Sequence, residues 1–356
     1  MEQIKSGILS AGREPRKSGP VRIGVLGCGY WGPNLIRNFA KLRSCEILAV
    51  ADLDPKKLEP VQWAYPKIKA LSAPDALLYE DAIEAVVIVT PVSTHYELAK
   101  TALENDKHVL LEKPLAASVK QAEELVQLAE ERGKILMVDH TFVYTGAVRK
   151  IRQLIETGEF GEIYYYDSVR VNLGLFQRES NVLWDLGPHD FSIMDYLIDE
   201  KPIGISAIGA KPVRRGDWAH ESVVYVAIHF RSGLLAHFHL NWLSPVKVRR
   251  TLIGGSKKMV VYDHLDPDNQ LKVFDKGVEV SLGEDLSKVL VQYRTGDMWA
   301  PKVDQTEALE IVCKHFIDCV QTGEKPITNG QVGLQIVRLL EAAQESMARH
   351  GEVIEL

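Results

Sequence analysis

The pattern of apolar and polar positions divides the chain into two regions. In the first, short apolar runs alternate with stretches that carry apolar residues about every 3.6 positions, and the runs read VRIGVLG, EILAVAD, IEAVVIVTP, KHVLLEKP and KILMVD. Unbroken apolar runs are typical of strands buried on both faces of a parallel sheet, with amphipathic helices between them. This α/β alternation predicts a Rossmann-type, doubly wound parallel sheet over residues 21–141.

From residue 142 the period of the pattern shortens to two. Segments such as SVVYVAIHF and LLAHFHLNWL alternate apolar with polar residues, which is typical of antiparallel strands with one covered face. Helices are expected at 145–157, 190–198, 304–321 and 331–348. Residues 142–356 are therefore predicted to form an α+β domain with a large, open, mostly antiparallel sheet, which binds the substrate and further subunits.

Composition and charge exclude several classes of protein. Net charge is −6 and no basic stripe is present, so a nucleic-acid partner is not expected. No run of 18 apolar residues occurs, so no membrane span is expected. The four cysteines form no CxxC pair, and we expect reduced thiols in a cytoplasmic protein without a metal site. Residues 1–20 are polar and are predicted to be a flexible tail.

The segment GCGYWG, directly after the first apolar run, matches the G-x-G-x-x-G pattern of dinucleotide-binding loops. Gly27 permits a tight turn, Gly29 lets the backbone approach a diphosphate, and Gly32 lets the following helix pack closely on the strand. The helix N-terminus would then face the phosphates. Tyr30 and Trp31 lie within this loop and are also expected to contact the cofactor.

Asp52 ends the second apolar run, at the distance from the glycine loop that the dinucleotide fingerprint requires. Its carboxylate is expected to accept hydrogen bonds from the hydroxyls of the adenosine ribose. A 2′-phosphate would meet like charge there, and no arginine directly follows, so we expect NAD rather than NADP. A capping role for Asp52 is the alternative.

Several polar residues follow later strands, at the sheet edge where doubly wound folds hold their ligands. Thr90 and Pro91 end one strand, His95 begins the next helix, and Glu112 with Lys113 ends the following strand. All five are expected to contact the cofactor. A solvated surface pair is the alternative interpretation of Glu112 and Lys113.

Asp185 and His189 lie at the predicted entrance to the helix at 190–198. Residues four apart share one side of a helix, so the carboxylate and the imidazole are expected to lie together. Histidine beside a carboxylate is a natural proton acceptor near neutral pH. A capping aspartate and a core histidine remain the alternative.

Taken in order, GCGYWG, Asp52, TPVSTH, EKP and DLGPH resemble the Gfo/Idh/MocA family of oxidoreductases, from Val21 over nearly the whole chain. The resemblance implies an NAD(P)-binding Rossmann domain, a C-terminal α/β domain, and hydride transfer at a carbinol carbon, usually of a sugar or cyclitol. It implies that Lys113, Asp185 and His189 line the site, and that the bond before Pro114 is cis.

Three further stretches, residues 139–148, 241–263 and 326–346, are similar to nucleotide-sugar 3-dehydrogenases that act on UDP-N-acetylglucosamine or its uronic acid. The resemblance therefore implies a sugar or nucleotide-sugar substrate. A dehydrogenase or ketoreductase of a simple sugar, an inositol or a 3-keto deoxysugar is one alternative. A non-catalytic NAD-binding regulator is another, although a regulator needs neither the lysine nor the histidine.

In the expected mechanism His189 accepts the hydroxyl proton, Lys113 donates hydrogen bonds to the substrate oxygen, and Asp185 orients the imidazole. Which of Lys113 and His189 is the base stays open. His140, Tyr144 and Asn172 are expected to contact the sugar. Basic residues considered for phosphate groups, with solvated charges as the alternative, are Arg170, Arg178, Lys247, Arg249 and Arg250.

Homo-oligomers are expected from two observations. Strand residues such as Tyr225, Phe238 and Trp242 are more numerous than two helices could cover, so the large sheet is expected to pack against a second copy. The family resemblance likewise implies a homodimer or a homotetramer.

Overall fold

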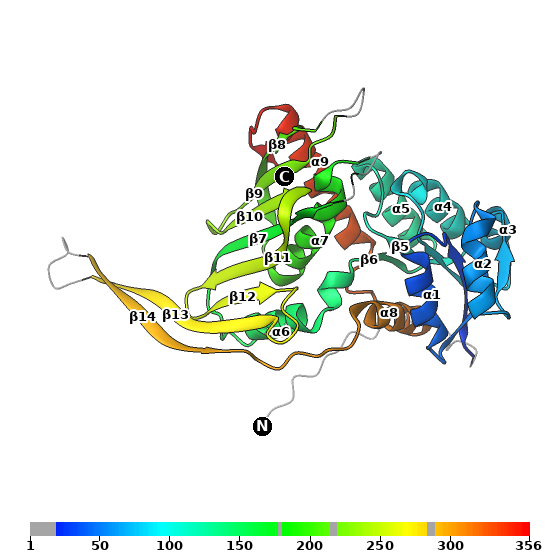
Figure 1. The fold of residues 1–356 in the computed structure, drawn as a ribbon, viewed down its shortest axis with the longest axis horizontal. Coiled ribbons are helices and arrows are strands. Elements are labelled where there is room, and N and C mark those ends of the chain that lie inside the picture. Colours follow the sequence, from blue (N-terminus) through cyan, green and yellow to red (C-terminus); the bar gives the residue numbers. More distant parts are fainter. Residues whose placement is uncertain (1–18, 175, 177–179, 214–218, 283–288) are drawn as a thin grey trace.

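The computed structural model places two sheets side by side, joined by helices that run between them (Figure 1). It describes residues 19–174, 176, 180–213, 219–282 and 289–356. The tail predicted over residues 1–20 lies outside the described residues except for its last two positions.

The first sheet is the predicted parallel sheet, with the order β3-β2-β1-β4-β5-β6. Its strands are β1 (Val21–Leu26), β2 (Cys45–Ala51), β3 (Lys69–Leu71), β4 (Ala85–Ile88), β5 (His108–Glu112) and β6 (Leu136–Asp139). All of its pairs are parallel. This order places the carboxyl ends of β1 and β4 next to each other, at the point where the direction of strand addition reverses.

Helices cover both faces of the first sheet (Figure 1). They are α1 (Gly32–Ala40), α2 (Pro55–Ala64), α3 (Asp75–Leu78), α4 (Val92–Glu104) and α5 (Val119–Glu131). The predicted cap at Ser118 is present, because its hydroxyl accepts a hydrogen bond from the backbone N–H of Gln121. None of the helices that the structure describes is long and apolar enough to cross a bilayer.

The second sheet is mixed and mostly antiparallel, with the order β14-β13-β12-β11-β7-β10-β9-β8-β15. Its strands are β7 (Ile163–Leu173), β8 (Pro202–Ala210), β9 (Val223–Phe230), β10 (Leu235–Asn241), β11 (Leu243–Gly255), β12 (Met259–Asp263), β13 (Leu271–Leu282), β14 (Val289–Trp299) and β15 (Ile354–Glu355). β7 and β10 pair in parallel. The hairpin of β13 and β14 extends away from the rest of the molecule (Figure 1).

One face of the second sheet packs on the helices α6 (Gly146–Glu156), α7 (Val182–Leu197) and α9 (Gly330–Ala348). Phe238 and Trp242 are buried in this core. The expectation that the helices leave them uncovered is therefore wrong for these two residues. Tyr225 lies on the other face and is 39% exposed.

The C-terminal helices connect the two sheets. α8 (Ala308–Thr322) packs against α1 and the first sheet, where Phe316 and Ile317 are fully buried. α9 contributes Leu334 and Val337 to the core on the other face of the first sheet, and Ile336 and Leu340 to the core of the second. The two cores are therefore held together by one helix.

The helix α7 begins eight residues earlier than predicted. The sequence predicted a start at residue 190. In the structure the side chain of Asn181 accepts a hydrogen bond from the N–H of Trp184 and caps the helix, which continues through Pro188. Asp185 and His189 are therefore inside the helix rather than at its entrance.

A buried ion pair joins β7 to α7. The guanidinium of Arg170 donates to Asp190, with Nε 2.5 Å from Oδ2 and Nη2 3.3 Å from Oδ1. Both side chains are 4% exposed, and the ring of Phe142 lies against the guanidinium. Arg170 is thus paired inside the core, and its expected role as a phosphate ligand is wrong.

Replacing Arg170 with methionine is expected to lower the free energy of unfolding by about 3–5 kcal/mol, because it leaves the charge of Asp190 buried and unpaired. The matched control is Arg250→Met, which removes a more exposed pair with Asp263 on the same sheet. That change is expected to cost about 1 kcal/mol or less. Urea unfolding at neutral pH measures both, and equal losses would contradict the assignment.

Candidate active site

The glycine loop leaves an open space at the N-terminus of α1. Gly27 has a φ of +97°, and a Cβ there would lie 2.4 Å from the carbonyl oxygen of Val89. A Cβ at Gly32 would lie 2.3 Å from the carbonyl oxygen of Gly27. At Gly29 a Cβ would meet nothing within 4 Å. The loop therefore requires glycine at two positions for its own shape, and at the third it presents bare backbone to the surroundings.

Asp52 supports this loop from the end of β2. Its Oδ2 accepts a hydrogen bond from the N–H of Cys28 at 2.8 Å, and its Oδ1 accepts one from the N–H of Asp54 at 2.9 Å. Lys57 Nζ lies 3.9 Å from Oδ1. Asp52 therefore holds the loop, whereas the cap of α2 is Asp54, whose side chain accepts a hydrogen bond from the N–H of Lys56. A carboxylate has about four acceptor positions, so acceptor capacity remains for ribose hydroxyls.

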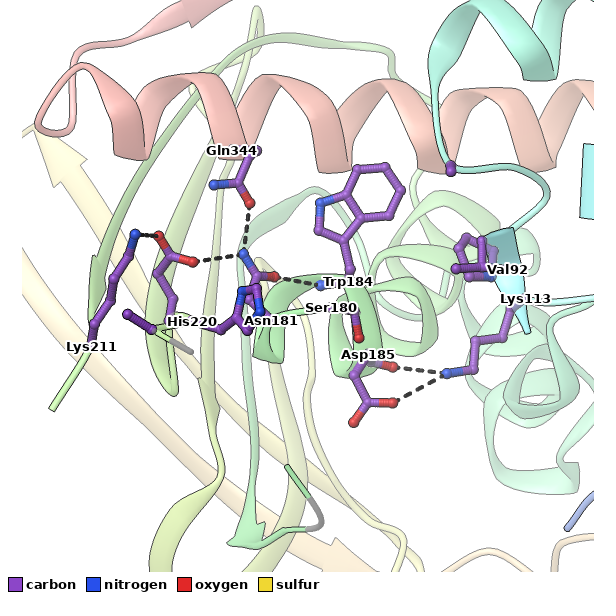
Figure 2. A pocket seen from close by; sticks show the side chains of 13 residues that line it. Val92, Lys113, Ser180, Asn181, Trp184, Asp185, Lys211, His220 and Gln344 are labelled. Carbon is purple, nitrogen blue, oxygen red and sulfur yellow. Dashed lines mark hydrogen bonds and ion pairs between the residues drawn. The ribbon is translucent and has the colours of Figure 1, made fainter. Parts of the chain in front are cut away.

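Lys113 and Asp185 face each other across the boundary between the two sheets (Figure 2). The Lys113 ammonium donates to the carbonyl oxygen of Asp185 at 2.9 Å and lies 3.6 Å from its Oδ1. Asp185 Oδ2 accepts a hydrogen bond from Trp242 Nε1 at 3.1 Å. The Lys113–Pro114 bond is cis, as the resemblance implied. The end of β5 and the first turns of α7 are in this way joined at one charged contact.

A cavity of about 620 Å³ opens beside this contact. Its lining comes from both parts of the chain, with Lys113 directly after β5 and Val92 at the start of α4, and with Asp185 and Trp184 from α7. Its far end is polar (Figure 2), and the side chains there are Asn181, Lys211, His220, Glu221 and Gln344. Its volume falls in the range of cavities that hold small organic ligands, roughly 300–1,000 Å³.

The polar side chains at the far end of the cavity are bonded to one another. Asn181 Nδ2 donates to Glu221 Oε2 at 2.9 Å and to Gln344 Oε1 at 2.7 Å. Lys211 Nζ lies 3.1 Å from Glu221 Oε1. One asparagine thereby caps α7 and links it to α9, so the lining of the cavity is fixed by contacts between three elements.

His189 lies among positive charges. The edge of its ring meets Phe142, with centroids 4.9 Å apart, and its Nδ1 is buried without a hydrogen-bond partner among the described residues. Burial holds the pKa of His189 well below its usual value, and the charges of Lys113, Arg170 and Arg249 act in the same direction. The neutral imidazole is therefore the favoured form.

The predicted pairing of Asp185 with His189 is wrong. Asp185 contacts Lys113 and Trp242 instead. Helical spacing places two side chains on one side of a helix but does not bring them into contact. The carboxylate of Asp185 pairs with Lys113, which lies directly after β5 of the first sheet, and not with His189.

Two family profiles match the chain. The one described as an oxidoreductase family with an NAD-binding Rossmann fold matches residues 21–140, and the GFO/IDH/MocA C-terminal domain matches residues 148–261. The chain belongs to the Gfo/Idh/MocA family of oxidoreductases. Its cofactor is NAD, as the sequence predicted.

Curated members of the Gfo/Idh/MocA family differ in substrate. UDP-N-acetylglucosamine 3-dehydrogenase of Acidithiobacillus ferrooxidans is 28% identical over 260 residues, which cover 72% of this chain and 78% of that protein. Inositol 2-dehydrogenase of Rhizobium meliloti is 24% identical over 344 residues, which cover 94% and 98%. The chain is thus a sugar-type dehydrogenase of this family.

A solved structure with the same fold is the WlbA dehydrogenase from Bordetella pertussis in complex with NADH and UDP-GlcNAcA. Its TM-score is 0.78 at 20% identity, and the match covers 96% of this chain and 99% of that one.

The glycine loop of this Gfo/Idh/MocA protein fits NAD. The open space at Gly29, the adjacent N-terminus of α1 and the remaining acceptor capacity of Asp52 suit a diphosphate and a ribose. Tyr30 is 85% exposed and Trp31 49%, while Thr90 is half-buried and Pro91 is exposed. Their contacts with NAD stay predictions.

His95, which is predicted to contact the cofactor, has no ring nitrogen left for a hydrogen bond to it. The ring is 1% exposed, its Nδ1 lies 2.9 Å from the carbonyl oxygen of Pro114, and its Nε2 lies 2.8 Å from that of Thr90. Both ring nitrogens are taken by the main chain. His95 instead ties the loop after β4 to the loop after β5.

Tyr144 and His140 do not reach the cavity either. Tyr144 is 1% exposed, and its hydroxyl lies 2.9 Å from Thr328 Oγ1 in the core beneath α8. His140 is also 1% exposed. The predicted sugar contacts of these two residues are therefore wrong, because both side chains turn inward. Asn172 is half-buried on β7, and its predicted contact stays a prediction.

The remaining basic residues considered for phosphate groups have different surroundings. Arg250 pairs with a carboxylate, and Lys247 is exposed. Arg249 is half-buried, and its burial lowers the pKa of its guanidinium. Arg178 lies outside the described residues.

Three features of the site are not predicted from the sequence. Trp242 supports Asp185 from the second sheet, and Asn181 organises the far end of the cavity. Asp139, which ends β6 beside Glu112, joins the buried polar cluster near Lys113. A signal for Asp139 was available, because it ends an apolar run at the ligand edge of the sheet as Asp52 does.

Proposed function

We propose that this protein oxidises a secondary alcohol of a nucleotide-sugar, at C3 of a UDP-N-acetylhexosamine or of its uronic acid, with NAD as the acceptor. The observation that carries the proposal is the Lys113–Asp185 contact at the mouth of a cavity. This contact lies at the carboxyl edge of the sheet that holds the glycine loop. Catalytic lysines need a fixed position beside the substrate, and Asp185 supplies one.

The comparisons support a nucleotide-sugar over a bare sugar. A curated relative acts on UDP-N-acetylglucosamine, and a structure with the same fold holds UDP-GlcNAcA. The cavity extends well beyond the Lys113 end, toward a polar end that includes Lys211 and His220. A ligand larger than a single sugar ring could use both ends. Inositol is the second candidate, because the inositol dehydrogenase covers nearly the whole chain.

NAD, when bound, accepts the hydride. In the proposed mechanism the Lys113 ammonium donates a hydrogen bond to the substrate oxygen and stabilises negative charge that develops there. His189 stays neutral and positions the hydroxyl, because nearby positive charges oppose a second proton on its ring. Asp185 holds the lysine in place through its carbonyl and its carboxylate. Lys113 rather than His189 thus handles the substrate proton.

The open face of the second sheet supports an oligomer. Tyr225 and Ile208 are exposed on neighbouring strands β9 and β8, at 39% and 58%. Large apolar side chains exposed on an uncovered sheet face are typical of subunit contacts. We therefore expect a homodimer or a homotetramer.

The test of the proposed function is a substrate panel. Purified protein is mixed with NAD and, in separate samples, with UDP-N-acetylglucosamine, UDP-N-acetylglucosaminuronate, N-acetylglucosamine and myo-inositol. The near-ultraviolet absorbance of reduced nicotinamide is then followed. Reduction with one of the UDP-sugars alone is the expected result. Reduction with inositol alone would replace the proposal by the second candidate, and no reduction with any of the four would contradict both.

A further inference from the structure

Four basic side chains lie close to the ring of Phe142, in the short segment after β6. The guanidinium carbons of Arg170 and Arg249 lie 4.5 Å and 5.8 Å from the centre of this ring. The rings of His189 and His264 meet it edge-on, and in both cases the centroids are 4.9 Å apart. The fold thus gathers basic groups from β7, β11, α7 and the turn after β12 at one aromatic ring.

Arg249 points toward the interior beside Arg170. The two residues are partners in the antiparallel register of β11 and β7, and residues directly opposite each other lie on the same face of a sheet. Arg170 lies on the face that α7 covers, because its guanidinium pairs there with Asp190. Arg249 therefore lies on the covered face as well, where a charged side chain is rare unless it is paired.

The carboxylates in this part of the second sheet are already paired with other residues. Asp190 accepts hydrogen bonds from Arg170 at both of its oxygens. Asp263, at the end of β12, accepts one from Arg250 at 2.8 Å. Arg249 Nε, in contrast, is buried without a hydrogen-bond partner among the residues that the structure describes. A buried, charged donor without an acceptor is costly, so it indicates that a further group binds there.

The two histidines carry no positive charge of their own. Burial lowers the pKa of His264 to about 4, and the charges of Arg249 and Arg170 act in the same direction. Burial likewise holds the pKa of His189 well below its usual value. Both rings are therefore neutral near pH 7, whereas a guanidinium keeps its proton in proteins. Since Arg170 is paired, the positive charge that is left for a ligand belongs to Arg249.

This basic cluster adjoins the reacting position but does not line the large cavity. His189, which is proposed to position the substrate hydroxyl, contacts Phe142, and the charges of Lys113 and Arg249 both act on its ring. The described residues that line the cavity of about 620 Å³ include Lys113 but not Phe142, His189 or Arg249. A nucleotide in that cavity would therefore leave Arg249 to a small group on the reacting sugar ring.

We propose that Arg249 binds the C6 carboxylate of the sugar and makes the protein selective for a UDP-N-acetylhexosaminuronate over the corresponding UDP-N-acetylhexosamine. The inference rests on the proposed function, and it selects one of the two substrates given there. A carboxylate carries a single negative charge, which matches the single unpaired charge of Arg249, and its two oxygens suit the fork of a guanidinium. The other oxyanion of these substrates is the diphosphate, which both of them contain.

Unfolding temperatures give the first test. A buried cation without an acceptor lowers stability, and a ligand that binds it raises the unfolding temperature. Arg249→Met is therefore expected to unfold, without ligand, at a temperature at least as high as the wild type, and to lose the rise that UDP-N-acetylglucosaminuronate produces in the wild type. The matched control is Arg250→Met, the next residue on β11, which is expected to keep that rise.

The second test is equilibrium binding of UDP-N-acetylglucosaminuronate and UDP-N-acetylglucosamine, which differ only at C6. Calorimetric titration uses protein loaded with NADH, because reduced cofactor cannot accept a hydride. Arg249→Met is expected to weaken binding of the uronate by about 100-fold, the loss for two charge-assisted hydrogen bonds, and to change binding of the neutral sugar little. Arg249→Lys keeps the charge and is expected to recover part of the loss. Arg250→Met is expected to bind both sugars as the wild type does.

Two results of the titration would overturn the proposal. Unchanged affinity of Arg249→Met for the uronate would show that this residue does not hold the carboxylate. Equal weakening for both sugars would assign Arg249 to the diphosphate. Turnover separates this inference from the proposed function. Oxidation of UDP-N-acetylglucosamine in preference to the uronate would keep the proposed function and overturn the inference, whereas Arg249-dependent binding of the uronate without NAD reduction by either sugar would support the inference and contradict the proposed function.

Discussion

Replacing Lys113 with alanine is expected to lower turnover by about 10²–10⁴-fold, the range for loss of a positioned acid–base group. The ammonium is 2.9 Å from the Asp185 carbonyl oxygen and opens onto the cavity, so alanine removes the donor while the lining otherwise stays in place. The measurement is the rate of NAD reduction with the sugar that the wild type oxidises.

The control for Lys113 is Lys120→Ala, which removes an exposed lysine at the start of α5. The Lys120→Ala variant is expected to reduce NAD at the wild-type rate. NAD binding, measured as a shift in the unfolding temperature, is expected to persist in Lys113→Ala. A Lys113→Ala protein that turns over within a few fold of the wild type would remove this residue from the mechanism.

Replacing Gly29 with valine is expected to weaken NAD binding by about 100-fold or more and to leave the fold intact. A Cβ at this position meets nothing within 4 Å, so the side chain fits the protein but fills the space that suits a diphosphate. Loss of two hydrogen bonds to a charged group, at roughly 1.5–3 kcal/mol each, corresponds to about 100-fold weaker binding or more. Equilibrium binding of NAD and the unfolding temperature without NAD are the two measurements.

The contrast to Gly29 is Gly32→Ala in the same loop. Its Cβ would lie 2.3 Å from the carbonyl oxygen of Gly27, so this variant is expected to unfold at a lower temperature even without NAD. Wild-type NAD affinity in Gly29→Val would show that the diphosphate does not lie at this loop.

Local patterns predicted the parts of the fold that depend on neighbours in sequence. The glycine loop, the cap at Ser118 and the buried strands of the first sheet follow from spacing and side-chain size over a few residues. The strand β8 was missed, because the segment PIGISAIGA contains two glycines and has a weak alternation. The early start of α7 was missed because the cap at Asn181 was not recognised, and the helix contains Pro188.

The site was harder to predict because it depends on contacts between distant segments. Position at the end of a strand does not determine whether a side chain faces the crevice or the core, and so His95 and Tyr144 were misplaced. The partner of Asp185 lies directly after β5, 72 residues earlier in the chain, and spacing within α7 holds no information about it. Lys113 was identified from the sequence because packing does not explain a charged residue at the end of a buried strand.

The position of α8 and α9 has a consequence for biosynthesis. Phe316 and Ile317 complete the core on one face of the first sheet, and Leu334 and Val337 complete it on the other. The ribosome releases these residues only after it has translated the strands β7 to β14 of the second sheet. The nascent N-terminal half therefore carries uncovered apolar surface for most of translation, which is the period in which chaperones bind such surfaces.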